Sequence, residues 1–238
     1  MKHKKTEQAT KKQAHKARLQ EAKIRRAAPD LALPAPTRLE RQRFLIVCEG
    51  KNTEPDYFYC FRQYFRVTAA EIIAIGGAGE TIRVVERAKK EREKSHFDQV
   101  WVVFDKDDFP ATHFEKAIHM AEKSEIYPAY SNQSFEYWLL LHFEDHQGGA
   151  MHRDQYGYKL NQYLAPFNMV FDTNGSKQIS LGLFQLLAGS DTKNGKKRID
   201  LAIERAEKIM DFHMDSTPAN AESSTTVFKL VRELLKFI

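Results

Sequence analysis

From residue 43 onward, short apolar runs alternate with longer segments in which apolar residues recur at helical spacing. The runs "RFLIVCEG" and "DQVWVVFD" are almost continuously apolar, which is typical of strands that are buried on both faces. "EIIAI" and "IYPAYS" are shorter runs that also predict strands. The segments between and after these runs have helical periodicity, and they cover residues 51–65, 80–94, 112–124 and 134–144.

This alternation of strand and helix predicts an α/β fold with a mostly parallel, four-stranded sheet and right-handed crossovers, flanked by helices. Strand signals fade after about residue 145, and the segments that follow read as amphipathic helices. We therefore expect an α/β core over residues 41–145 and a helical C-terminal part over residues 146–238, packed on that core.

The charge is distributed unevenly along the chain. The net charge is +5, but residues 1–28 hold ten Lys and Arg against two Glu, so the remainder is mildly acidic. This basic segment has almost no apolar residues, which predicts disorder or a partly formed helix over residues 1–40, with Pro34 and Pro36 marking a linker. Such an arm is either a handle for nucleic acid, where phosphate contacts release counterions, or a solvated leader.

Composition excludes several classes of protein. No apolar run approaches the roughly 20 residues that span a bilayer, and no apolar segment follows the basic N-terminus as in a secretory signal. Cys48 and Cys60 are the only cysteines and have no metal-binding spacing. We expect a cytoplasmic protein that does not enter the membrane.

Two of the predicted strands end in acidic residues. Glu49 ends the first strand, and Asp105 and Asp107 end the third. In open parallel sheets, ligands bind beyond the carboxyl ends of the strands. Residues two apart in an extended segment point to the same side, so Asp105 and Asp107 can face Glu49 together. The pattern predicts a carboxylate cluster, and the alternative is that residues 105–108 form an acidic surface turn.

A cluster of this kind is unfavourable unless cations compensate it. Carboxylate oxygens suit Mg²⁺ or Mn²⁺, which also take phosphate oxygens of a substrate as ligands. Gly50 allows close backbone approach after Glu49, and a helix that begins near Glu54 directs free N–H groups toward an anion. We expect Glu54 to hydrogen-bond the helix start rather than to bind metal.

The pairing of a strand-end E-G with a strand-end D-x-D-D resembles the TOPRIM domain of topoisomerases, primases and overcoming-lysogenization-defect nucleases. Longer segments resemble the ordered motifs of the RloB-like family, and they are "FLIVCEGKNTEPDYF", "WVVFDKDDF", "YSNQSFEYWLLLHFE" and "NAESSTTVFKLV". The resemblance covers roughly residues 40–238. It implies a TOPRIM-like core and a metal-dependent nuclease in a bacterial defence or restriction locus, beside an ATPase partner.

Two departures from the family pattern leave the acidic residues untouched. The family usually reads S-N-P-C-F-E at the end of the fourth strand, where this chain has Gln133 and Ser134 in place of Pro and Cys. The late motif, usually N-P-S-T, is loosened here to "NAESST". Neither change involves Glu49, Asp105 or Asp107, so the expected metal centre stands.

The resemblance and the chemistry together assign roles to the acids. Asp105 and Asp107 would hold the metal, and Glu49 would either join them or accept a proton from the attacking water or hydroxyl. Asp108 is a weaker candidate ligand, because it should point away from Asp107. Glu136 precedes the apolar run "YWLLLHF", so we expect it either as a further metal ligand or in an internal salt bridge.

Six residues are candidates for contact with nucleic acid, namely Lys51, Asn132, Ser134, Lys196, Lys197 and Arg198. Lys51 follows the Glu49-Gly50 strand end and is also a candidate catalytic residue that touches a phosphate, unless it is simply a surface lysine. The last three belong to "DTKNGKKR", residues 191–198, which is either a basic loop that grips a backbone or a solvated loop.

Three functions compete at this point. The first is a Mg²⁺- or Mn²⁺-dependent nuclease of DNA or RNA, with tRNA among the substrates considered. The second is a non-catalytic nucleic-acid-binding or regulatory subunit of a defence ATPase complex. The third is phosphotransfer on a small nucleotide, for which a long cationic arm is unnecessary. No G-x-x-x-x-G-K-[ST] motif occurs, so ATPase activity would belong to a partner chain. We expect the nuclease, and leave a homodimer open.

Overall fold

The computed structural model describes residue 13 and residues 15–18, 41–146, 149–193 and 195–238. Residues 41–238 form one compact unit, so the predicted core and the predicted C-terminal part belong to the same body. The predicted basic arm over residues 1–40 lies outside the described residues, apart from residues 13 and 15–18. Within the described residues, no helix is long and apolar enough to cross a membrane.

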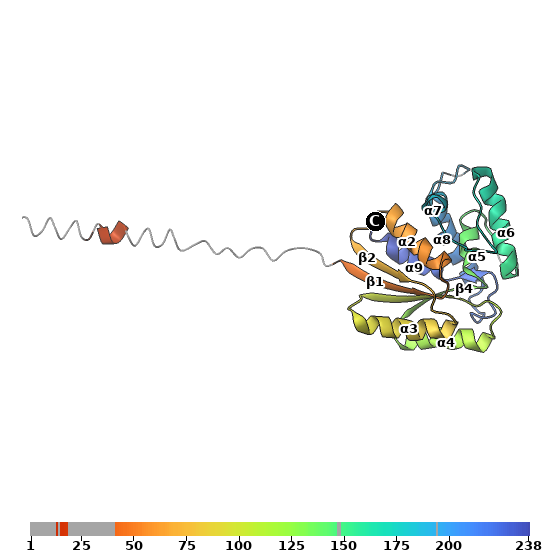
Figure 1. The fold of residues 1–238 in the computed structure, drawn as a ribbon, viewed down its shortest axis with the longest axis horizontal. Helices are drawn as coiled ribbons and strands as arrows, with labels where there is room; N and C mark the ends of the chain where they lie inside the picture. Colours follow the sequence, from red (N-terminus) through yellow and green to blue (C-terminus); the bar gives the residue numbers. More distant parts are fainter. Residues whose placement is uncertain (1–12, 14, 19–40, 147–148, 194) are drawn as a thin grey trace, which may run out of the picture. The chain divides into compact units, whose positions relative to one another are not determined.

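A five-stranded, mostly parallel sheet forms the centre of the fold (Figure 1). The strand order is β2-β1-β3-β4-β5, and the first four are parallel to their neighbours. The strands are β1 (Gln42–Cys48), β2 (Ala70–Ile75), β3 (Gln99–Asp105), β4 (Tyr127–Asn132) and β5 (Ser224–Thr225). After β1 the chain forms β2 on one side of β1, and it later forms β3 on the other side of β1. The strand order therefore reverses between β1 and β3.

Both faces of the sheet are covered, as the apolar runs predict. In β1, Phe44, Ile46 and Cys48 pack into one core layer, whereas Leu45 and Val47 pack into the other. Helices α3 and α4 cover the second face, and the remaining helices gather on the first (Figure 1). The helices of the strand-rich part are α2 (Thr53–Tyr64), α3 (Thr81–Lys94), α4 (Ala111–Lys123) and α5 (Phe135–Leu141).

The C-terminal part is helical, as expected. Its elements are α6 (Arg153–Leu164), the 3₁₀ turn η1 (Ala165–Phe167), α7 (Leu181–Ala188), α8 (Arg198–Phe212) and α9 (Val227–Leu235). These helices share one hydrophobic cluster with α2 and α5, which anchors them to the sheet. The α/β class predicted from the sequence is therefore confirmed.

The sheet has one strand more than the four that the sequence predicts. β5 runs antiparallel to β4, with Ser131 opposite Thr225 and Asn132 opposite Ser224. The Thr226 N–H donates to the Tyr130 carbonyl (2.8 Å), and the Tyr130 N–H donates to Thr226 Oγ1 (2.8 Å). A strand of two residues is too short to produce an alternating pattern, which explains why the sequence gives no signal for it.

Candidate active site

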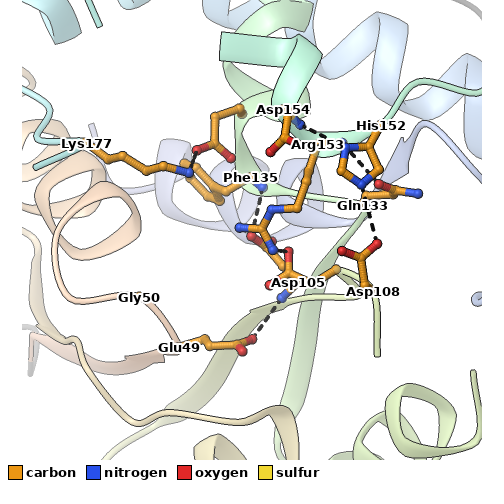
Figure 2. A network of polar contacts seen from close by, with 12 residues as sticks. Glu49, Gly50, Asp105, Asp108, Gln133, Phe135, His152, Arg153, Asp154 and Lys177 are labelled. Carbon is orange, nitrogen blue, oxygen red and sulfur yellow. Dashed lines mark hydrogen bonds and ion pairs between the residues drawn. The ribbon is translucent and has the colours of Figure 1, made fainter. Parts of the chain in front are cut away.

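Parallel pairing of β1 and β3 brings Glu49 and Asp105 to the same edge of the sheet. Cys48 lies opposite Val103, and the Glu49 N–H continues the ladder by donating to the Val103 carbonyl (2.9 Å). The Asp105 N–H then donates to Glu49 Oε2 (3.1 Å), which directs the Glu49 carboxylate across the strand ends (Figure 2). The predicted convergence of these two residues is therefore present in the fold.

Asp105 is partly enclosed, and one of its two carboxylate oxygens is buried. Its Oδ2 accepts the Phe135 N–H at the start of α5 (3.1 Å), while its buried Oδ1 has no hydrogen-bond partner among the described residues. Burial, followed by the charges of Glu54 and Asp107, raises the pKa of Asp105 well above its usual range. A buried carboxylate oxygen without a donor is costly, so this atom is suited to a cation.

Asp107 is held by a small network that also includes Gln133 and Arg153 (Figure 2). Its backbone has a φ of +45°, in the left-handed region, and its N–H donates to the Gln133 carbonyl (3.0 Å). Gln133 Oε1 accepts the Arg153 N–H (3.1 Å), and the Arg153 guanidinium forms an ion pair with Asp107. Burial raises the pKa of Asp107, and the Arg153 guanidinium opposes that shift.

Glu54 and Gly50 form the side of the cluster that follows β1. The Gly50 N–H donates to Glu54 Oε1 (3.1 Å), so Glu54 supports the turn before α2, as the sequence predicts. A Cβ at residue 50 would lie 2.3 Å from Glu54 Oε2, so a larger residue there would displace the Glu54 carboxylate. Burial is the main cause that raises the pKa of Glu54 to about 7, and it likewise raises the pKa of Glu49 to about 8.

Glu136, in the first turn of α5, forms an ion pair with Lys177, whose Nζ lies 2.8 Å from Oε1. Lys177 belongs to the loop before α7 and has a φ of +50°. The N-terminal end of α2 holds this loop, because Thr53 Oγ1 donates to the Lys177 carbonyl (2.9 Å). Of the two alternatives predicted for Glu136, the internal salt bridge is therefore the one observed.

These side chains line one cavity with a volume of about 300 Å³. It contains five carboxylates and three cations, which are Glu49, Glu54, Asp105, Asp107, Glu136, Lys51, Arg153 and Lys177. The cavity lies where the strand order reverses, which is the usual ligand position in open α/β sheets. Burial is the main cause that raises the pKa of four of these carboxyl groups, and the charges of neighbouring acids add to it.

The carboxylate oxygens of the cavity are chemically suited to bind a divalent cation. Carboxylate oxygens are the ligands that Mg²⁺ and Mn²⁺ prefer, and Asp105 Oδ1 lacks a partner among the described residues. Asp105, Asp107 and Glu49 are the residues that the sequence predicts would hold such an ion, and all three line the cavity. In the described part of the chain, however, no group of three or more Asp, Glu, His or Cys side chains is already drawn together as a metal site. Arg153 and Lys177 instead neutralise two of the acids.

Three other predicted residues lie outside the cavity. The Asp108 side chain is 74% exposed and lies 3.5 Å from His152 Nε2, so it points away from the acids as its position after Asp107 suggests. Asn132 is fully buried, and its amide donates to the carbonyls of Pro218 and Ala219 (3.0 Å each). Ser134 is also fully buried. Burial of Asn132 and Ser134 argues against the predicted contact with nucleic acid.

Two of the four basic residues of the predicted loop, Lys196 and Arg198, are paired with acids within the fold. Lys196 Nζ lies 2.9 Å from both carboxylate oxygens of Glu204. Arg198 is only 6% exposed, and its guanidinium contacts Asp191 (3.8 Å) and lies over the rings of Phe143 and Phe167. Arg198 is thus a packing residue, contrary to the prediction. Lys197 is exposed.

Sequence reasoning missed two of the cations in the cavity. Arg153 and Lys177 come from segments after residue 145 that carry no motif, and their acidic partners are distant in sequence. The one available signal was indirect: a buried cluster of carboxylates requires compensating cations. Lys51 is where the sequence places it, at the rim of the cavity and exposed.

Comparison with known proteins gives one match. The sequence model of a family described as RloB-like protein matches residues 44–234, which include every residue of the cavity. No curated protein and no solved structure matches the chain significantly.

Proposed function

Because the chain belongs to the RloB-like family, we propose that it is a TOPRIM-type nuclease that depends on Mg²⁺ or Mn²⁺ and hydrolyses phosphodiester bonds in DNA or RNA. The observation that carries this proposal is the convergence of five carboxylates and three cations on one cavity at the strand-order reversal. Metal-dependent phosphodiester hydrolysis combines acids that hold a cation with cations that hold a phosphate. We further propose that the activity serves bacterial defence against phage, with an ATPase chain as partner.

The chain's own residues take distinct roles in this proposal. Asp105 and Asp107 hold the metal, and Glu49 either joins them or accepts the proton of the attacking water or hydroxyl. The bound ion would act as a Lewis acid toward the phosphoryl oxygens. Lys51, exposed at the rim, contacts a phosphate of the substrate. Glu54 holds the turn at Gly50 and so fixes the position of Glu49.

One observation favours a second function. Arg153 and Lys177 already neutralise Asp107 and Glu136, and the described residues include no ready-made group of metal ligands. Such paired charges, without a metal site, would be sufficient for a non-catalytic subunit that binds nucleic acid within a defence ATPase complex. In that case nucleic-acid binding would survive the loss of Asp105.

A metal titration combined with a cleavage assay separates the two functions. We would titrate Mg²⁺ and Mn²⁺ into the wild type and into Asp105→Asn/Asp107→Asn by calorimetry, and incubate both with plasmid, single-stranded DNA and total tRNA. Glu204→Gln/Glu207→Gln removes two exposed acids of α8 and is the matched control. The nuclease predicts metal binding and cleavage in the wild type and the control, and loss of both in the Asp105/Asp107 variant.

The other outcomes are equally informative. Metal binding without cleavage would direct the search to the ATPase partner or to another substrate, and the assay would be repeated with that chain added. If the wild type binds no metal, or the Asp105/Asp107 variant cuts as well as the wild type, the nuclease proposal fails.

A further inference from the structure

The two ion pairs in the cavity join different parts of the chain. Asp107 and Glu136 belong to the strand-rich part, whereas Arg153 begins α6 and Lys177 lies in the loop before α7. Figure 2 shows Arg153 reaching toward Asp105 from the opposite side to Glu49, and Lys177 reaching toward the start of α5 near Phe135. Each pair therefore places a cation from the C-terminal part directly on an acid of the cavity.

The backbones of both cationic residues are fixed, while their charged ends are partly exposed. The Arg153 N–H is held by Gln133 Oε1, and the Lys177 carbonyl is held by Thr53 Oγ1. The Arg153 side chain is 28% exposed and that of Lys177 is 34% exposed, against 20% for Asp107 and 7% for Glu136. The acids are thus the enclosed partners, and each cation can leave its acid without unfolding the segment that carries it.

We propose that Arg153 and Lys177 are exchangeable cations: they neutralise Asp107 and Glu136 until a divalent ion binds the cluster, and they are then released to bind phosphate groups of the nucleic acid. This inference rests on the proposed function, because it requires a divalent ion at these carboxylates. It adds two phosphate-binding residues to the site and makes their availability depend on the metal.

Charge and geometry both support the exchange. A divalent ion at the acids would repel a guanidinium and an ammonium that remain in contact with the same carboxylates. Once free, Arg153 offers a planar fork that matches two phosphate oxygens, and Lys177 offers a compact charge. Lys51 lines the same cavity but forms no ion pair with any described residue, so its contact with phosphate should not depend on the metal.

The first test measures competition for the acids. Mn²⁺ affinity would be determined by electron paramagnetic resonance for the full-length wild type, Arg153→Gln and Lys177→Gln. Arg232→Gln is the matched control, because Arg232 forms an exposed ion pair with Glu207 (2.7 Å). Removing a competing cation should tighten Mn²⁺ binding about three- to tenfold in the two cavity variants and leave it unchanged in the control.

The second test measures whether a divalent ion releases Arg153 and Lys177 from their acidic partners to bind phosphate. Binding of a labelled oligothymidylate would be followed with Ca²⁺, which takes the same oxygen ligands, and with chelator alone. Arg153→Gln and Lys177→Gln should weaken binding and lower its salt dependence by about one phosphate contact only when Ca²⁺ is present. Lys51→Gln should weaken binding under both conditions.

Mn²⁺ binding that is unchanged or weaker in both cavity variants would overturn the inference, because the two cations would then only position the loops. The proposed nuclease would survive that result if the wild type still binds metal and cuts. If no variant and no wild type binds Mn²⁺, both proposals fail. Should Arg153→Gln not fold, Lys177→Gln alone decides, and Arg153→Lys, which keeps the charge, should restore wild-type Mn²⁺ affinity.

Discussion

In the sequence, the acidic residues of the cavity and the basic loop at residues 191–198 both look like binding sites. In the fold, their charges are compensated in different ways. In the loop, Lys196 is paired with Glu204, and Arg198 is buried between Asp191 and two phenylalanine rings. In the cavity, acids outnumber cations, and Asp105 Oδ1 has no partner within the described residues. A charged segment that is neutralised by its own fold contributes packing, whereas an excess of enclosed charge calls for a ligand.

The largest expected effect comes from Asp105→Asn. This change removes the negative charge of the carboxylate that we propose as a metal ligand, while an amide oxygen can still accept the Phe135 N–H. Loss of a residue that merely supports a ligand costs roughly 10- to 100-fold in metal affinity, so loss of Asp105 should cost more than that. Calorimetry with Mn²⁺ measures this loss of affinity.

Without metal, the melting temperature of Asp105→Asn at pH 8 should be higher than that of the wild type, because the variant lacks the enclosed negative charge. A lower melting temperature would contradict this prediction.

Arg198→Ala should have the next largest effect, on stability and not on binding. It removes a buried guanidinium that packs on Phe143 and Phe167 and leaves Asp191 without this partner. We expect the free energy of unfolding to fall by about 2 kcal/mol, measured by urea denaturation. Affinity for an oligonucleotide, measured below the urea transition, should stay unchanged. A selective loss of affinity would reinstate Arg198 as a contact residue.

The pH dependence of stability should show the unfavourable charge of the cavity directly. The folded state raises the pKa of Glu49 from 4.5 to about 8, so the folded protein binds the proton more tightly than the unfolded chain. Its contribution to stability is present below pH 4.5 and is lost as the pH rises toward 8. Urea denaturation of Glu49→Gln should show a smaller loss between pH 6.5 and 8 than the wild type, and saturating Mn²⁺ should offset the wild-type loss. An identical pH profile for Glu49→Gln would contradict the prediction.

The smallest effect is expected for Lys196→Gln/Lys197→Gln. The Lys196 pair with Glu204 is more than half exposed on both sides, and exposed pairs contribute roughly 0–1 kcal/mol. Oligonucleotide affinity and melting temperature should both remain close to those of the wild type. Fluorescence anisotropy against Lys51→Gln, which should bind more weakly, provides the comparison.

The sequence was informative wherever one physical rule acts over a short span. Almost continuous apolar runs identified β1 and β3, because a strand covered on both faces has no polar side, and shorter apolar runs identified β2 and β4. Parallel connectivity then placed Glu49 and Asp105 at one edge, since neighbouring parallel strands end together. These two inferences needed no knowledge of side-chain packing.

The rest depends on contacts between distant segments. The fold pairs Lys177 with Glu136, 41 residues earlier, and no local pattern marks either as the other's partner. Arg198 was misread for the same reason, because its stacking on Phe143 and Phe167 comes from three separate segments. Gln133, which stands where the family usually has Pro, uses its side chain to hold Arg153. Its identity alone did not indicate this.

The short strand β5 sets the order in which the molecule can assemble during synthesis. Ser131 and Thr225, which pair across β4 and β5, are 94 residues apart in the chain. At the usual rate of translation, roughly 5 to 20 s pass between the appearance of these two residues. During that interval the edge of β4 that faces away from β3 is unpaired, and an unpaired strand edge can accept a strand from another chain. Pairing of β5 with β4 is therefore one of the last steps in completing the sheet.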